Sequence, residues 1–442
     1  MSTRVRGPVP AEPLPQAGEG RIFWRLLKLV APFAWRMVLA AILGFATIGS
    51  SIGLMSTSGY LIARAALRPS IADLQIAIVG VRFFGIARGG FRYLERLVSH
   101  EVTFRLLARL RVWFYRALEP LAPARLMQYR SGDLLARVVA DVETLENLYL
   151  RVLAPPVVAL LVAVLVAVLM GAFDAGLALA LLLSLLLAGA GLPLLTQRLA
   201  RGTGRHLVGV RAKLNGLLVD GIQGVGDLLA SNAEGRHLRR VERLSLDLVG
   251  LQRKMARIGG LESALGGLLM NLATLAVLAL AIPLVNTAEL DGVYLAMLVL
   301  IVLSSFEAVL PLPRAFQYLN GSLEAGRRLF EIVDTAPAVV DPVQPAGKPA
   351  EATLRVKNLR FSYEPDGSPA LDDISFDLAQ GQFVAVVGPS GAGKSTLAHL
   401  LLRFWEYREG HILLDGRELR EYDQETARSL MAVVSQHTYL FN

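Results

Sequence analysis

The sequence predicts a multidomain membrane protein, with six membrane spans and long cytoplasmic helical extensions, followed by a truncated α/β domain. Of its 442 residues, 54% are hydrophobic, and the mean hydropathy of +0.48 is too high for an ordinary soluble enzyme. The apolar residues gather in segments near the ~20 residues that a bilayer requires. Beyond residue 352 the hydrophobic period becomes strand-like, and the glycine-rich stretch "GPSGAGKS" follows one such run.

The net charge and the absence of cysteine limit the classes of partner and metal site that the chain can have. The formal net charge is +8 and the pI is about 9.8, which admits nucleic acid as a partner. However, the basic residues lie between apolar spans, where cytoplasmic membrane loops carry them, so membrane topology is the better explanation and no nucleic-acid partner is expected. The sequence has no cysteine, which excludes disulfides and thiolate metal sites.

The N-terminal region divides into two parts. Residues 1–20 are polar and Pro-rich without an apolar core, so we expect a disordered cytoplasmic tail and no cleaved signal. From Arg21, "RIFWRLLKLVAPFAWR" alternates basic and bulky apolar groups at helical spacing. This pattern predicts a helix that lies along the membrane surface. It opens a transmembrane domain expected over residues 21–332.

Six candidate spans follow. The second is the weakest because it carries four arginines, at positions 82, 88, 92 and 96. The loops between spans two and three and between spans four and five are rich in arginine, which places both loops and both termini in the cytoplasm. The predicted spans are Met37–Ala63, Leu74–Leu97, Leu150–Ala172, Ala175–Thr196, Leu261–Val285 and Val293–Leu312.

In the two long cytoplasmic loops, apolar residues recur at intervals of three and four residues. This spacing is typical of helices that continue out of the membrane. Short helices are expected near Gly132–Arg137 and Gly221–Leu229. Because one side of these helices is too apolar to stand alone in water, they should pack against another surface.

A linker is expected over residues 333–352, where "TAPAVVDPVQPAGKPAEA" is rich in Pro and Ala. Residues 353–442 then begin an α/β domain. The segments "TLRVKNLRFSY" and "ISFDL" are typical of strands, and "FVAVV" (383–387) is a continuous apolar run typical of a buried parallel strand.

The stretch from Gly388 to Ser395 matches the phosphate-binding pattern G-x-x-x-x-G-K-[ST] in full. Its glycines let backbone N–H groups point at phosphate oxygens, Lys394 should reach the β- and γ-phosphates, and the Ser395 hydroxyl should ligate Mg²⁺. A helix that begins near Lys394 adds its N-terminal dipole to the same anion. The residues predicted to bind ATP here are Gly388, Ser390, Gly391, Ala392, Gly393, Lys394, Ser395 and Thr396.

The order of spans, helical loops, linker and phosphate loop resembles an ABC exporter half-transporter. The resemblance implies that Tyr363 in "RFSYEPD" stacks on adenine and that Gln436 in "VVSQHTYLFN" is the Q-loop glutamine that contacts Mg²⁺. Within the family, "GGFRYLERLVSHEVTFRLL" and "SSFEAVLPLPRAFQYL" look like the CydC type. That likeness implies export of cysteine or glutathione across the bacterial inner membrane in support of cytochrome bd assembly, with a CydD-like subunit as heterodimer partner. It does not choose between the two thiols.

Arg88, Arg92, Arg96 and His100 recur every four residues and form a slowly winding helical stripe. The stripe is suited either to the carboxylates of a haem or of glutathione, with His100 as axial iron ligand, or to neutralising headgroups at the cytoplasmic edge, with His100 as a capping or packing residue. The CydC likeness adds weight to haem binding by Arg92, Arg96 and His100. In span six, Glu307 is either a partner of one arginine or part of the substrate path, and we prefer the ion pair because an unpaired charge there is costly.

ATP turnover in the family uses a signature loop, a Walker B carboxylate pair and a switch histidine, none of which we find in this sequence. We therefore expect the chain to supply ATP-binding residues, no catalytic residue of its own, and exposed sheet edges. The resemblance implies alternating access in the complete assembly. Two alternatives stay open, namely an exporter of lipid or drug cargo and a non-transporting ATP- or haem-binding regulatory subunit.

Overall fold

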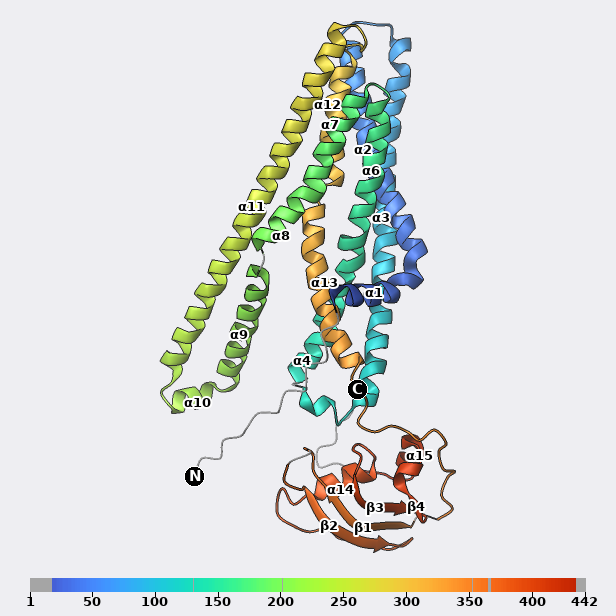
Figure 1. Ribbon diagram of the computed structural model, residues 1–442, viewed down its shortest axis with the longest axis vertical. Coiled ribbons are helices and arrows are strands. Elements are labelled where there is room, and N and C mark those ends of the chain that lie inside the picture. Colours follow the sequence, from blue (N-terminus) through green and yellow to red (C-terminus); the bar gives the residue numbers. More distant parts are fainter. Residues whose placement is uncertain (1–17, 130, 201, 352, 365–366, 435–442) are drawn as a thin grey trace. The chain divides into compact units, whose positions relative to one another are not determined.

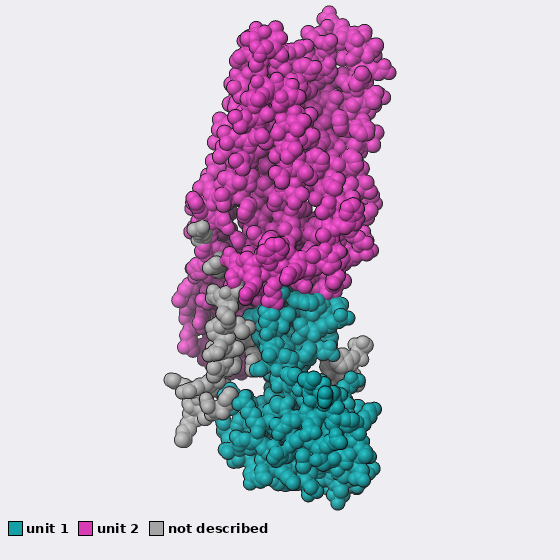
Figure 2. All heavy atoms as spheres, turned by 45° about the vertical axis from the view of Figure 1, so that its right-hand side comes forward, with its two compact units in different colours: residues 1–16, 111–139, 328–442 teal, residues 17–110, 140–327 magenta. Residues whose placement is uncertain are grey.

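The computed structural model describes residues 18–129, 131–200, 202–351, 353–364 and 367–434 (Figure 1). They fall into two compact units, coloured separately in Figure 2. We call residues 17–110 and 140–327 the helical unit, and residues 111–139 with 328–442 the sheet unit. The sheet unit includes residues 111–139, which the sequence analysis assigned to the transmembrane domain.

Long helices dominate the chain. Most are α-helical, with short 3₁₀ segments (η1, η2, η3, η7) and π-helical segments (η4, η5, η6) between them. In chain order they are α1 (Glu19–Val30), η1 (Ala31–Phe33), α2 (Ala34–Ala65), α3 (Ile71–Leu118), η2 (Glu119–Leu121), η3 (Leu126–Gln128), α4 (Ser131–Ala136), η4 (Arg137–Asp141), α5 (Val142–Asn147), η5 (Leu148–Leu153), α6 (Ala154–Gly171), α7 (Ala175–Leu186), η6 (Leu187–Gly191), α8 (Leu192–Ala200), α9 (Thr203–Gln223), α10 (Val225–Ala230), α11 (Glu234–Asn286), α12 (Tyr294–Ser305), η7 (Phe306–Ala308) and α13 (Leu312–Val333).

Helix α1 is amphipathic. Ile22, Leu26 and Val30 recur every four residues and are buried, whereas Trp24 is 66% exposed. A side chain at Gly326 would meet Leu26, since an added Cβ would lie 3.0 Å from a Leu26 methyl carbon. The helix predicted from Arg21 is present, but it ends at Val30, and the residues after the 3₁₀ turn already belong to α2.

Helix α6 shows how the helical unit builds its core. Val158, Val162, Val166 and Met170 recur every four residues and are buried. The opposite stripe holds Leu160, Val164 and Val168, which are exposed apolar side chains of the kind that lipid covers. The tight turn to α7 is capped by Asp174, whose carboxylate accepts a hydrogen bond from the Leu177 N–H at 3.1 Å.

Among the described residues, five helical stretches are long and apolar enough to cross a membrane, namely 19–65, 132–171, 175–200, 234–286 and 294–333. They overlap five of the six predicted spans and cover each of these to within one residue at each end. The predicted second span, Leu74–Leu97, lies inside α3 but is not among the five. The predicted short helices correspond to α4 and, one turn later than expected, to α10.

The sheet unit holds an antiparallel sheet in the order β2-β1-β3-β4, built from β1 (Leu354–Phe361), β2 (Leu371–Leu378), β3 (Glu409–Leu414) and β4 (Arg417–Glu418). In its register Leu354 of β1 faces Leu378 of β2 and Leu414 of β3. The sheet packs against α14 (Lys394–Leu401), and η8 (Leu419–Glu421) and α15 (Gln424–Ser429) complete the unit. Its core includes Leu359, Leu400 and Ile412, all fully buried.

The prediction for residues 383–387 is wrong. This run forms no strand, and the side chains of Phe383 and Val387 are 99% and 88% exposed. A parallel strand that is buried on both faces needs a hydrogen-bonded neighbour. In the part of the chain that the structure describes, every strand pairing is antiparallel and none involves this run.

Candidate functional site

The predicted phosphate loop precedes α14, and Gly393 is the residue before the first turn of that helix. Gly393 has a φ of +84°, and a Cβ added there would lie 2.2 Å from the carbonyl oxygen of Ala370. Both facts require glycine, since side chains disfavour this φ and the contact is impossibly short. The backbone can therefore turn tightly against β2 and direct the N–H groups of α14 outward.

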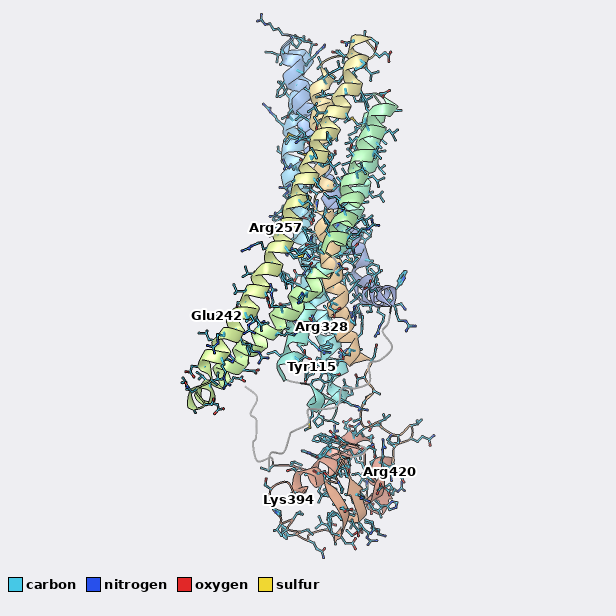
Figure 3. All side chains as sticks on the ribbon, turned by 60° about the vertical axis from the view of Figure 1, so that its left-hand side comes forward. Tyr115, Glu242, Arg257, Arg328, Lys394 and Arg420 are labelled. Carbon is cyan, nitrogen blue, oxygen red and sulfur yellow. The ribbon has the colours of Figure 1, made fainter. Side chains whose placement is uncertain are left out.

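Lys394 and Ser395 lie in the exposed first turn of α14 (Figure 3, Lys394 labelled). The Lys394 ammonium donates hydrogen bonds to the carbonyl oxygens of Gly388 and Pro389, each at 2.8 Å. The lysine thus bends back over the loop, with its charge where phosphates are expected. The cradle fits Mg²⁺-ATP: the loop N–H groups, the helix dipole and Lys394 would hold the phosphates, and the Ser395 hydroxyl is accessible to the metal ion.

Tyr363 lies beside this helix. Its hydroxyl donates a hydrogen bond to the Thr396 hydroxyl at 3.0 Å, and its ring meets Trp405 edge to face, with 5.4 Å between ring centroids. Tyr363 remains 48% exposed. The structure therefore brings Tyr363 to the phosphate loop, although stacking on adenine stays a prediction. Gln436 lies outside the described residues.

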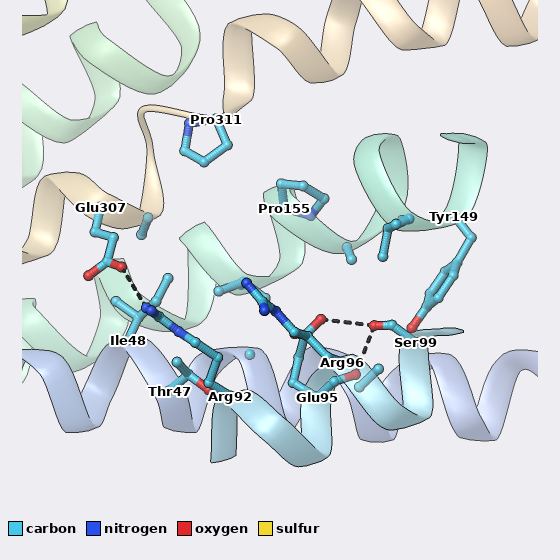
Figure 4. A pocket seen from close by; sticks show the side chains of 16 residues that line it. Thr47, Ile48, Arg92, Glu95, Arg96, Ser99, Tyr149, Pro155, Glu307 and Pro311 are labelled. Atoms are coloured by element: carbon cyan, nitrogen blue, oxygen red, sulfur yellow. Dashed lines mark hydrogen bonds and ion pairs between the residues drawn. The ribbon is translucent and has the colours of Figure 1, made fainter. Parts of the chain in front are cut away.

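A cavity of about 270 Å³ opens in the helical unit (Figure 4). It is lined from α2, α3, η5, α6 and the segment between α12 and α13. Arg92 and Glu307 meet there, with 3.3 Å between a guanidinium nitrogen and a carboxylate oxygen. The ion pair preferred for Glu307 is confirmed, and Arg92 is its partner.

Other charged and polar side chains complete this cavity. Arg96 lines it and makes no ion pair or hydrogen bond among the described residues. Glu95 also lines it, and its carboxylate accepts a hydrogen bond from the Ser99 hydroxyl at 2.9 Å. Glu95, Ser99 and Tyr149 also line the cavity, and none of them was predicted from the sequence. The helical spacing of Ser99 four residues after Glu95 is a signal that was available.

The stripe winds out of the cavity at both ends, because each step of four residues turns it further around α3. Neither Arg88 nor His100 lines the cavity, and His100 is exposed with its ring stacked on Phe104. The cavity is also smaller than the ~300 Å³ lower bound of drug-sized pockets. It therefore does not fit haem with His100 as a ligand.

Within the sheet unit, Arg137 joins the short α4 region to the end of α13. Its side chain is 10% exposed and forms ion pairs with Asp133 and Glu331 at 3.1 and 3.2 Å. It also donates to the Arg328 carbonyl at 2.9 Å. This buried clamp ties the α4 region to the end of α13.

Two family models match the chain. The model described as ABC transporter transmembrane region matches residues 26–306, and the model described as ABC transporter matches residues 371–442. The first covers more than half of the chain. The chain belongs to the ABC transporter family. Its two matched regions are a membrane-spanning domain and an ATP-binding domain, in the order found in ABC exporter half-transporters, and members of this family hydrolyse ATP.

Several relatives are similar over nearly the whole chain. The glutathione/L-cysteine transport system ATP-binding/permease protein CydC of Escherichia coli is 33% identical over 421 residues, which are 94% of this chain and 73% of that protein. CydD of the same kind of system in Bacillus subtilis is 31% identical over 94% of this chain and 72% of its own length. An ATP-dependent lipid A-core flippase of Burkholderia orbicola is 28% identical over 83% of this chain and 61% of that protein.

Proposed function

We propose that the protein is one subunit of a heterodimeric, ATP-driven exporter that moves cysteine or glutathione from the cytoplasm to the periplasm and supports cytochrome bd assembly. The observation that carries the proposal is the likeness to glutathione/L-cysteine transport proteins over 94% of the chain, at the identities given above. The charged cavity of the helical unit supports it, because Arg96 offers a cation to an anionic or zwitterionic solute.

The proposed topology places six spans in the bacterial inner membrane, with both termini in the cytoplasm. The arginine-rich loops support this orientation. Helix α3 would supply the second span, and two of its arginines, Arg92 and Arg96, line the cavity, where charges at membrane depth are tolerated. The domain division proposed from the sequence, with a tail over 1–20 and a linker over 333–352, accompanies this topology.

The chain's own residues act at two places, the phosphate loop and the Arg137 clamp. Gly393, Lys394 and Ser395 hold the nucleotide, and a CydD-like partner completes the site in which ATP is hydrolysed. When bound, Mg²⁺ neutralises phosphate charge. The Arg137 clamp would carry closure of the nucleotide domains toward the membrane helices, because it fixes the α4 region to α13.

Thiol uptake into inverted membrane vesicles tests the proposal, with the chain and its CydD-like partner expressed together. ATP should drive accumulation of labelled cysteine or glutathione, and Lys394→Ala should abolish it. ATP-independent binding without accumulation would instead identify a regulatory subunit. Arg137→Ala should retain ATPase activity but lose uptake, whereas Arg327→Ala, which removes an exposed pair with Glu324, should change neither.

A second candidate is export of a lipid, favoured by the likeness to the lipid A-core flippase. The same vesicles distinguish it, since a lipid exporter would move labelled lipid between leaflets and leave thiols outside.

Haem binding through His100 is a separate proposal. Because His100 lies outside the cavity lined by Arg92 and Arg96, haem would need a site on the exposed face of α3 around His100 and Phe104. Loss of the haem Soret band in His100→Ala would support this site, and an unchanged spectrum would remove it.

A further inference from the structure

A second and larger cavity, of about 630 Å³, lies in the helical unit between η5, α6, η6, α8, α11 and α13. Its walls are largely apolar, and Gly266 and Gly267 leave space on the α11 side. Leu150, Pro155 and Pro311 line both this cavity and the smaller one that holds Arg96. The two cavities are therefore neighbours that share a wall.

One carboxylate in the larger cavity lacks a partner. The Oε2 atom of Glu262 is buried and accepts no hydrogen bond among the described residues. A buried carboxylate oxygen in that state is costly unless a cationic donor reaches it. Arg314, from α13, is close enough to attract Glu262 electrostatically, yet it does not donate to this oxygen. The cavity thus presents a negative and a positive group without joining them.

Arg151 is the other cation of this cavity. It hydrogen-bonds the Tyr318 hydroxyl, and its guanidinium lies over the Tyr318 ring at 4.7 Å. Tyrosine is neutral, so this pairing orients Arg151 without cancelling its charge. The cavity therefore offers one carboxylate and two guanidiniums, a set complementary to one ammonium and one or two carboxylates.

We propose that this cavity is the entry site for a small zwitterionic solute, with Glu262 receiving its ammonium group and Arg314 its carboxylate. Free amino acids and short peptides have this chemistry. The inference rests on the proposed function, since it names the chemical class that the exporter would accept. An apolar wall beside the paired charges leaves room for an uncharged side chain such as a thiol.

Three probes separate the two charged contacts. L-cysteine has both groups, N-acetyl-L-cysteine lacks the ammonium, and L-cysteine methyl ester lacks the carboxylate. Binding is measured on the purified chain in lipid nanodiscs. Glu262→Gln should weaken L-cysteine binding about tenfold or more, as loss of a charged hydrogen-bond partner does, and leave N-acetyl-L-cysteine unchanged. Arg314→Gln should weaken the binding of L-cysteine and leave the binding of L-cysteine methyl ester unchanged.

Matched control residues lie on α11, the helix that carries Glu262. Glu242 and Arg257 are exposed residues of α11 that do not line the cavity (Figure 3), so Glu242→Gln and Arg257→Gln should bind L-cysteine as the unmodified chain does. Glu262→Asp, which keeps the charge, should recover part of the binding lost in Glu262→Gln. This recovery distinguishes loss of the contact from misfolding.

The outcomes separate the inference from the proposed function. If Glu262→Gln binds all three probes like the unmodified chain while vesicles still accumulate thiol, the entry site is wrong and export stands. If the probes bind as predicted but ATP drives no accumulation, the site stands and export is wrong. Equal binding of the three probes to the unmodified chain would also overturn the site.

Discussion

Arg92 and Glu307 are 215 residues apart in the sequence, and their side chains meet at 3.3 Å in the cavity of the helical unit (Figure 4). The contact joins α3 to η7, just before α13. Two charges within apolar spans would each be costly alone, so each stabilises the other there. The pair also leaves Arg96 as the cation of this cavity that is accessible to a solute.

Removing either partner of this pair should destabilise the helical unit. Because both side chains are about 40% exposed, solvent screens the pair, and we expect a coupling of about 1 kcal/mol. A double-mutant cycle of Arg92→Ala and Glu307→Ala, read as melting temperature in nanodiscs, measures it. The exchange Arg92→Glu with Glu307→Arg should recover stability, and additive single effects would contradict the contact.

Gly393→Ala should abolish nucleotide binding, because the new Cβ would lie 2.2 Å from the Ala370 carbonyl oxygen. Gly391 offers a matched control, since its φ of +85° is similar but nothing lies within 4 Å of an added Cβ. Gly391→Ala should therefore lose only the free energy of holding a non-glycine residue at positive φ, about 1–2 kcal/mol. Equal loss of ATP binding in the two variants would show that the close contact is not the cause.

Arg403→Met should strongly destabilise the sheet unit. The Arg403 side chain is 3% exposed, pairs with Asp341 at 3.4 Å, and donates to the carbonyl oxygens of Val340 and Tyr422. Removing it leaves these groups without their donor, at a cost of about 2–4 kcal/mol. Proteolysis near residue 340 measures the opening. Arg355→Met, which removes an exposed pair with Asp377, should cost less than about 1 kcal/mol.

The sheet unit should lose stability in acid partly through Glu418. Burial acts to raise the pKa of this carboxyl, but hydrogen bonds from Tyr407 and His411 and the charge of Arg420 lower its pKa below the ordinary value. A lowered folded-state pKa gives stability that is present above the unfolded-state pKa and is lost as the pH falls through the folded-state pKa. In urea unfolding at a series of pH values, Glu418→Gln should reduce the fall of the unfolding free energy with decreasing pH. An unchanged fall would contradict the role of Glu418.

The helices and the phosphate loop were predictable because their signals are local. Apolar runs of span length, basic loops and the pattern from Gly388 to Ser395 each lie in one continuous stretch. An ion pair of Glu307 with one of the span-two arginines was predictable from the cost of an unpaired charge in the membrane, whereas its partner, Arg92, came only from the structure. The bounds of α1 shifted because Pro32 and its neighbours form a 3₁₀ turn that divides the predicted helix from α2.

The rest depends on contacts between distant segments. An apolar run such as 383–387 predicts a buried strand, but burial requires neighbours that the described residues do not supply. Strands β3 and β4 were missed, as was the second cavity. Glu262 and Arg314 are ordinary charged residues in the sequence, and only the fold places α11 and α13 on the walls of the same cavity.

Protection of the intact chain against heating by Mg²⁺-ATP tests the central claim most directly, which is that the loop at Lys394 binds nucleotide. Binding stabilises a protein by about 2.7 kcal/mol when ligand is at a hundred times its Kd. We therefore expect the melting temperature to rise by several degrees with Mg²⁺-ATP and to stay unchanged in Lys394→Ala. No rise in the unmodified chain, at saturating nucleotide and magnesium, would contradict the account.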